Sequence, residues 1–496
     1  MKAFFRVLLP VLVVFAACNK PDVPVVQSGN DSASMLKFQF EPGLNHGMET
    51  TCTAIDIDSI WFITIPENAD LTKLAPEIIV SEGASVQIDG AQYIQGNTYN
   101  FSGNLQNVIV TSGSGKQTVE YRICVKKGNP QADNEVYRIM KDFKVPGVAV
   151  SIMKGTEIVY STGLGFANKE NFERCTDDHL FRIAGISRIF CTVCVMVLES
   201  QGRIGLNQFV FGDNGILKGI FKDVTPYHES ITVKHLLSCS SGLCAGLDDP
   251  CFTDSFRYYE GSTVPVPVDT LIQRVLDVRR QPYEEGSTVW SAGAGYNDSN
   301  LDYCILQRIV EVVGGKDYES FLKEDVLESM GIQDTHIGGH SYELRENECH
   351  YYTEDRNDAD AVPLRETAGA LGVISSSKQL MNILSCIDSD DSVPDILSYE
   401  HLQEMYSPFS YSGGGPFGES FKRYGLGWII NHPYLFEGAH FIYGSMPGST
   451  ALLVGNTYQN MSGAILCNAS AVNENENGTI KENLESLMQK LIKYFE

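Results

Sequence analysis

Hydrophobic and polar residues alternate along the first quarter of the chain, in short runs that predict β-strands. Between residues 35 and 127, runs such as IDSIWFITI (57–65) and TVEYRICV (118–125) are separated by polar and glycine-containing stretches. The segment NVIVTSGSGKQTVEYRICV predicts a hairpin that turns at Gly113-Ser114-Gly115, because glycine adopts the backbone conformations of tight turns without strain. We therefore predict an all-β domain over residues 35–127.

Apolar residues take a helical spacing at both ends of the segment 128–496. The segment 133–144 places Val136, Ile139, Met140 and Phe143 on one face, and 479–495 carries a similar stripe; such stripes pack onto a core. The segment 185–200 is apolar nearly all round and precedes Gly202, which predicts a helix buried between layers. With the hairpin pattern after Val145, these helices predict a second domain of the α+β class.

The first residues have the pattern of an exported lipoprotein. Residues 1–18 combine Lys2 and Arg6 with the apolar run 7–15 and end in FAAC, a pattern typical of a signal peptide whose Cys18 becomes lipidated. Residues 19–34 form a polar tether rich in Pro, Ser and Asp. We expect a lipid anchor at Cys18 to hold the protein on a bacterial envelope membrane, the outer membrane by preference. The sequence does not say whether the protein lies on the periplasmic or the surface face of that membrane.

Composition narrows the classes of partner. The 62 acidic and 37 basic residues give a formal net charge of -25, which argues against nucleic acid and anionic lipid surfaces as partners. Of 13 cysteines, Cys244 and Cys251 are close enough in sequence to suggest a local disulfide. The cysteines and histidines lack zinc spacing, and we expect neither a metal nor a cofactor.

Several segments, in a constant order, resemble the serine β-lactamase and penicillin-binding protein family, and in particular its class C β-lactamase-related branch. These are the hairpin VPGVAVSIMKGTEIVYSTGLGFAN from residue 145, ITVKHLLSCSSGL (231–243), LDYCILQRIVEVVGG (301–315), DVLESMGIQDTHIG (325–338), ETAGALGVISSSKQLMNIL (366–384) and YGLGWII (424–430). The resemblance implies an antiparallel sheet, packed by the first and last helices of the domain, beside an all-helical subdomain. Residues 77–123 are similar to the immunoglobulin-like modules that precede enzymes in Bacteroidetes lipoproteins, which implies a β-sandwich acting as a spacer or stalk.

The family's nucleophile motif is replaced. In the family, a Ser at the start of the buried helix is followed three residues later by a Lys that accepts its proton. The resemblance places these positions at Gly185 and Arg188 within FRIAGISRIF. Glycine has no side chain, and a guanidinium stays protonated, so Arg188 cannot act as the base. Ser187 is a nearby hydroxyl that we weigh as a displaced nucleophile, although it points roughly 200° away from position 185 around the helix.

The second motif of the family, Tyr-x-Asn, is half retained. Counting back from the following helix places Asp298 and Asn300 at its two positions. A rival register would give the tyrosine role to Tyr296. The two registers stay open at this point.

The third motif, Lys-Thr-Gly or His-x-Gly on the strand at the edge of the site, becomes Ile442-Tyr443-Gly444. Gly444 is retained and the basic residue is lost. His440 lies two residues upstream and therefore on the same face of the strand as position 442, so it is a second possible substitute.

Together the replacements favour a catalytically inactive family member, because loss of the nucleophile alone costs on the order of a millionfold in triad hydrolases. In this interpretation the family cleft, rimmed by Asn300, Tyr443 and Gly444, still binds a peptide, a muropeptide or a partner protein. The alternative is an active β-lactamase, D-Ala peptidase or esterase with a displaced nucleophile, built from Ser187, Tyr296 and His440.

Overall fold

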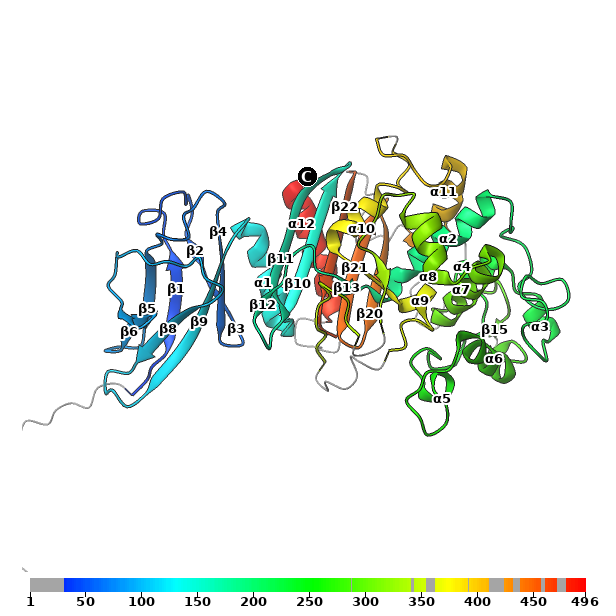
Figure 1. Cartoon of the computed structure of the whole chain (residues 1–496), viewed down its shortest axis with the longest axis horizontal. Coiled ribbons are helices and arrows are strands. Elements are labelled where there is room, and N and C mark those ends of the chain that lie inside the picture. Colours follow the sequence, from blue (N-terminus) through cyan, green and yellow to red (C-terminus); the bar gives the residue numbers. More distant parts are fainter. Residues whose placement is uncertain are drawn as a thin grey trace, which may run out of the picture.

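The N-terminal part of the chain is a two-sheet β-domain (Figure 1). The computed structural model describes residues 31–286, 288–339, 343–353, 362–390, 392–409, 423–430, 438–455, 460–470 and 479–496; the predicted signal peptide and Cys18 lie outside them. One sheet has the order β2-β1-β5 and the other β3-β4-β9-β8-β6-β7. The strands are β1 (Met35–Phe40), β2 (Cys52–Thr53), β3 (Ile55–Ile57), β4 (Ile60–Ile65), β5 (Pro76–Val80), β6 (Ser85–Ile88), β7 (Ala91–Gln92), β8 (Gln106–Thr111) and β9 (Thr118–Lys127). Phe38 and Phe40 of the first sheet share a buried core with Ile63 and Val110 of the second, an arrangement consistent with an immunoglobulin-like sandwich.

The predicted strand at 57–65 is wrong in one respect, because it is two strands joined by a tight turn. Asp58 and Ser59 both have positive φ, at 49° and 68°, and Ile57 pairs with Ile60 across the turn. Two left-handed residues are what a two-residue hairpin turn requires. The predicted hairpin at residues 113–115 is confirmed, since Thr111 pairs with Thr118.

The second domain is built on an eight-stranded antiparallel sheet with the order β12-β11-β10-β22-β21-β20-β19-β18. Its strands are β10 (Gly147–Lys154), β11 (Glu157–Asn168), β12 (Glu173–Arg174), β18 (Arg423–Tyr424), β19 (Ile429–Ile430), β20 (His440–Met446), β21 (Ser449–Gly455) and β22 (Met461–Cys467). The C-terminal strand β22 pairs with β10, the first strand of the domain. The two ends of the domain are therefore tied together at the centre of the sheet.

Helices α1 (Pro130–Phe143) and α12 (Ile480–Phe495) cover one face of this sheet. Asn129 caps α1 by accepting from the backbone of Gln131 and Ala132, and Thr479 caps α12 together with Glu482. Alternate strand residues such as Val148, Val150 and Ile152 point toward these helices. The intervening residues, such as Ala149 and Met153, face the other layer. The predicted α+β fold with packed first and last helices is confirmed.

The other face of the sheet carries α10 (Ser377–Leu384) and a largely helical subdomain, seen beyond the sheet in Figure 1. At its centre is the buried α2 (Ser187–Ser200), which follows a single 3-10 turn, η1 (Ala184–Ile186). The subdomain also holds α3 (Pro226–Glu229), α4 (Val233–Leu237), α5 (Asp254–Arg257), α6 (Val268–Val278), α7 (Asn300–Gly314), α8 (Tyr318–Phe321), the π-helix η2 (Leu322–Leu327), α9 (Ala368–Leu371) and α11 (Tyr399–Tyr406). Short strands complete it: β13 (Phe181–Arg182), β14 (Tyr283–Glu285), β15 (Thr288–Trp290), β16 (His336–Ile337) and β17 (Val373–Ser375).

The two domains meet through a buried junction. Arg174 of β12 donates to the backbone oxygen of Val125 at 2.9 Å and to Oδ1 of Asn104 at 2.7 Å. Phe62 of the β-domain packs into the same core as α1 and the sheet. The β-domain is therefore docked on the second domain by apolar and polar contacts, beyond its covalent connection.

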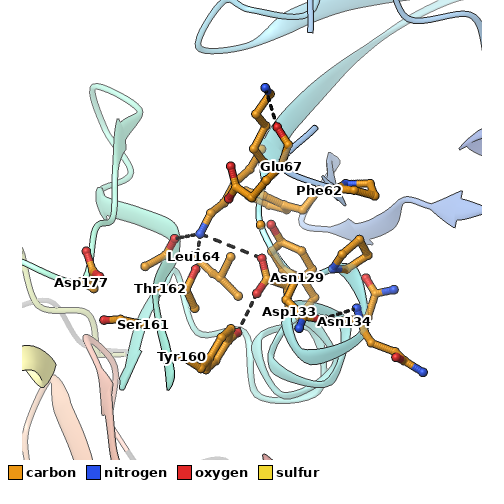
Figure 2. A pocket seen from close by; sticks show the side chains of 18 of the residues that line it. Phe62, Glu67, Asn129, Asp133, Asn134, Tyr160, Ser161, Thr162, Leu164 and Asp177 are labelled. Carbon is orange, nitrogen blue, oxygen red and sulfur yellow. Dashed lines mark hydrogen bonds and ion pairs between the residues drawn. The ribbon is translucent and has the colours of Figure 1, made fainter. Parts of the chain in front are cut away.

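A polar network crosses the junction beside a cavity of about 1160 Å³ (Figure 2). Asp133 of α1 is fully buried and accepts from Tyr160 of β11 at 2.6 Å and from Thr64 of β4 at 2.8 Å. Lys126 of β9 lies 4.0 Å from the same carboxylate and donates to Thr162 of β11. Burial raises the pKa of Asp133, an effect that the charge of Lys126 reduces.

Candidate functional site

Gly185 lies in η1, just before α2, where strand β20 passes close to the turn. The predicted helix start at 185 is wrong by two residues, because Ala184 has a φ of +47° and residues 184–186 form the 3-10 turn. A Cβ atom on Gly185 would lie 2.7 Å from the backbone oxygen of Tyr443. This is closer than real Cβ contacts, so position 185 has no space for a serine side chain unless β20 moves.

Gly444 of β20 allows a second close approach between the same two segments. A Cβ on Gly444 would collide with the backbone oxygen of Ile183, and both Gly444 and Gly185 are buried. The close approach at Gly444 is therefore made by the chain itself, at Ile183.

The neighbouring strand residues point to opposite faces. Ile442 is buried in the core shared with the helical subdomain. The side chain of Tyr443 faces α12, where its hydroxyl donates to Glu485 and its ring lies 3.9 Å from the Lys481 ammonium. This corrects the expectation that the Tyr443 side chain rims the cleft, because successive side chains of a strand alternate between faces.

Arg188 holds Asp298 and Asn300, the two residues that the first of the two registers assigns to the second motif. Its side chain is 7% exposed, and Nη1 donates to Oδ1 of Asp298 at 2.6 Å while Nη2 donates to Oδ1 of Asn300 at 2.7 Å. Desolvation acts to raise the pKa of Asp298, but the charge and hydrogen bond of Arg188 outweigh it and leave that pKa below its usual value. The Asp298 side chain is still 67% exposed, so this ion pair has one buried and one solvated end.

Tyr296 belongs to the same cluster. Its hydroxyl donates to Oδ1 of Asp298 at 3.1 Å, and its ring stacks on Tyr424 with centroids 4.3 Å apart. Desolvation and the Asp298 charge raise the pKa of Tyr296 well above its usual value. The phenol is therefore held in its protonated form and is unsuited to accept a proton.

The other two possible substitutes lie away from this cluster or face elsewhere. Ser187 is fully buried, and its hydroxyl accepts the backbone N–H of Val373 at 3.0 Å. His440 stacks on Tyr406 with ring centroids 4.0 Å apart, and burial lowers the pKa of His440 to about 4. It is four residues from Gly444, roughly 13 Å along the strand. The structure thus brings together Arg188, Tyr296, Asp298 and Asn300, and leaves Ser187 and His440 apart.

Asp249 is a member of the cluster that the sequence analysis missed. It lies in the loop AGLDDP, and its Oδ2 accepts from Nδ2 of Asn300 at 2.5 Å. Burial raises the pKa of this carboxyl. Neither spacing nor a motif distinguishes this aspartate from its neighbour Asp248, so the sequence held no signal that would have found it.

The disulfide suggested between Cys244 and Cys251 is not present in the structure. All twelve cysteines within the described residues are free and buried. Cys244 accepts a hydrogen bond from Ser299, with the two atoms 3.4 Å apart, whereas Cys251 lies 3.6 Å from Cys304. Within the same residues, no group of three or more His, Cys, Asp or Glu side chains is placed to hold a metal ion.

The family model for beta-lactamase matches residues 132–486, which is more than half of the chain. The chain belongs to the beta-lactamase family. Relatives of this beta-lactamase-family protein include the putative penicillin-binding protein PbpX of Bacillus subtilis, which is 23% identical over 323 residues, 64% of this chain and 70% of that protein. Protein flp of Staphylococcus aureus is 19% identical over 345 residues, 69% of this chain and 63% of that protein.

Solved structures show the same beta-lactamase-related fold. The octameric penicillin-binding protein homologue from Pyrococcus abyssi is similar with a TM-score of 0.57 and 22% identity, over 73% of this chain and 77% of that one. The D-amino acid amidase from Ochrobactrum anthropi SV3 is similar with a TM-score of 0.55 and 19% identity, over 74% of this chain and 100% of that one. Within the described part of this beta-lactamase-family chain, no helix is both long and apolar enough to cross a membrane.

Proposed function

We propose that the protein is a non-acylating member of the beta-lactamase family, an envelope lipoprotein that binds a peptide, muropeptide or partner protein at the family cleft. The observation that carries the proposal is the packing at position 185. The backbone oxygen of Tyr443 lies 2.7 Å from where a Cβ would be, so a serine at this position would collide with β20, which supports the loss of the family's nucleophile.

The state of Arg188 supports the same interpretation. The family's lysine would accept a proton, whereas Arg188 is a fixed cation that donates to Asp298 and Asn300. Ser187, the alternative nucleophile, uses its hydroxyl oxygen to accept the Val373 N–H inside the core. Among the residues that the structure describes, no contact of Ser187 favours the alternative of an active hydrolase.

The exposed carboxylate of Asp298 indicates what a ligand at this place would offer. It is 67% exposed beside the stacked rings of Tyr296 and Tyr424. A carboxylate next to aromatic rings suits an ammonium group on an apolar stem, such as a side-chain amine in a stem peptide. The names of relatives such as PbpX make a cell-wall peptide the first probe to use. The lipid anchor expected at Cys18 would place the protein near such peptides.

Covalent labelling tests the loss of acylation. Purified protein is treated with a fluorophosphonate and with a fluorescent penicillin, and intact-mass analysis follows, with an active class C β-lactamase as the positive control. We expect no added mass. An adduct that maps to Ser187, or to any other serine, would contradict the proposal and identify the nucleophile.

Calorimetric titration with a lysine-containing stem pentapeptide tests ligand binding. We expect wild type to bind and Asp298→Asn to bind several-fold more weakly, because the variant loses the charge that faces the ammonium group. Asp213→Asn, at an exposed carboxylate that pairs with Lys218, is the matched control and should bind as wild type does. Absence of binding by wild type would refute this ligand class.

A further inference from the structure

Two thiols from distant parts of the chain touch beside the candidate site. Sγ of Cys251, in the loop before α5, lies 3.6 Å from Sγ of Cys304 in α7, and the two residues are 53 positions apart in sequence. Both residues are fully buried. A disulfide bond is about 2.0 Å long, so the two sulfurs need to approach by roughly 1.6 Å to form one.

Cys251 is connected to the site through its own loop. Its backbone N–H donates to Oδ1 of Asp249 at 2.9 Å, while Oδ2 of the same carboxylate accepts from Asn300. Asn300 in turn accepts from Arg188 at 2.7 Å. Cys304 lies one helical turn after Asn300 in α7. A bond between the sulfurs would join both sides of the Asp249–Asn300 contact.

We propose that Cys251 and Cys304 form a redox pair whose oxidation to a disulfide fixes the 244–252 loop, and with it Asp249, onto the first turn of α7. The oxidant is a disulfide, either a small molecule or a thiol–disulfide oxidoreductase. One cysteine thiolate attacks this disulfide and releases one thiol, which leaves a mixed disulfide. The second thiolate then displaces the other thiol, so two electrons and two protons pass from the cysteines to the oxidant.

The pairing rests on geometry, whereas its occurrence in the cell also rests on the proposed export, because disulfides persist in oxidising compartments. Burial restricts access of the oxidant. The contact with Cys304 and burial both raise the pKa of the Cys251 thiol, which keeps little of it as the reactive thiolate. We therefore expect exchange to occur during folding, or when the loop opens.

Peptide mapping of the oxidised full chain tests the pair. The protein is exposed to oxidised glutathione both when folded and during refolding from urea, free thiols are blocked, and the digest is analysed without reduction. We expect a linked peptide containing Cys251 and Cys304, lighter by about 2 Da than its two free parts. We also expect the oxidised protein to melt a few degrees above the reduced protein.

Variants make the assignment specific. Cys304→Ser should abolish the link, while Cys386→Ser, a buried cysteine elsewhere in the domain, should leave it intact. Absence of the linked peptide under both conditions would overturn the proposal, as would a Cys244–Cys251 link in its place. The same mapping on protein whose thiols are blocked at cell lysis distinguishes this proposal from the proposed export. If the two cysteines are linked after oxidation in solution but reduced in the cell, the redox pair is supported and export to an oxidising compartment is contradicted.

Discussion

Replacing Arg188 by methionine removes the centre of the candidate site while keeping an unbranched side chain in its place. Arg188 is 7% exposed and donates to Asp298 and to Asn300. Methionine fills most of the same space. The change in stability therefore reports mainly on the polar contacts.

The two contacts differ in environment, and this difference sets the expected magnitude. Asn300 is 6% exposed, and a hydrogen bond from a charged group to a buried acceptor contributes about 1.5–3 kcal/mol. Asp298 is 67% exposed, so its ion pair contributes at most about 1 kcal/mol after solvent screening. We expect Arg188→Met to lower the free energy of unfolding by about 2–3 kcal/mol and Asp298→Asn to lower it by about 1 kcal/mol or less.

Urea denaturation followed by near-ultraviolet circular dichroism measures both variants. The pKa of Asp298 is below its usual value of 3.8 in the folded protein, so its contribution is present above pH 3.8 and is lost as the pH falls through the lower folded pKa. The difference between wild type and Asp298→Asn should therefore shrink in acid. A larger loss for Asp298→Asn than for Arg188→Met would refute this reasoning. A gain in stability for Arg188→Met would show that the desolvation cost of the buried guanidinium exceeds the value of its hydrogen bonds.

Three further predictions concern the packing at Gly185, the junction between the domains and the half-buried His440. The double variant Gly185→Ser and Arg188→Lys restores the family residues, and we expect it to form no penicillin adduct. Its free energy of unfolding should fall by about 1–3 kcal/mol, because the new Cβ overpacks against β20. Stoichiometric acylation of the double variant would contradict this prediction. Arg174→Ala should make the junction between the domains more sensitive to limited proteolysis, since Arg174 donates hydrogen bonds to Val125 and Asn104 across it. The control variant Arg138→Ala, at an exposed ion pair within α1, should be cleaved as wild type is. Equal cleavage of the two variants would count against a docked β-domain. Wild type should lose stability as the pH falls from 6.5 to about 4, because the folded pKa of His440 is about 4 and the unfolded state takes up the proton first. His440→Phe should remove part of this loss. An unchanged pH profile would refute a His440 that stays neutral in the folded protein.

The fold was predictable because its signals are periodic, whereas the site depends on register. Side-chain burial imposes periodic patterns, such as the strands on either side of the turn at residues 113–115 and the apolar stripes of α1 and α12. The helix α2 is marked by apolar residues all round. The face of Tyr443 and the start of α2 each depend on a shift of one or two residues, which periodicity does not determine. The Asp58-Ser59 turn inside a predicted strand is a similar case. Asp249 and the Cys251–Cys304 contact join segments far apart in the chain and left no local pattern.

The proposed loss of acylation is compatible with an intact family fold, because the replaced residues find partners within the protein. Gly185 and Gly444 let β20 pack directly against the residues around η1, so backbone oxygens lie where a side chain at either position would begin. Arg188 donates hydrogen bonds to Asp298 and Asn300, and its guanidinium stays protonated where the family's lysine would accept a proton. Active sites carry strain and unpaired polar groups that reduce stability, and here most of those groups have partners within the protein. The part of the cluster that still faces solvent is the Asp298 carboxylate with Tyr296, so recognition of a ligand is expected there, and a variant that alters Asp298 should change binding more than it changes folding.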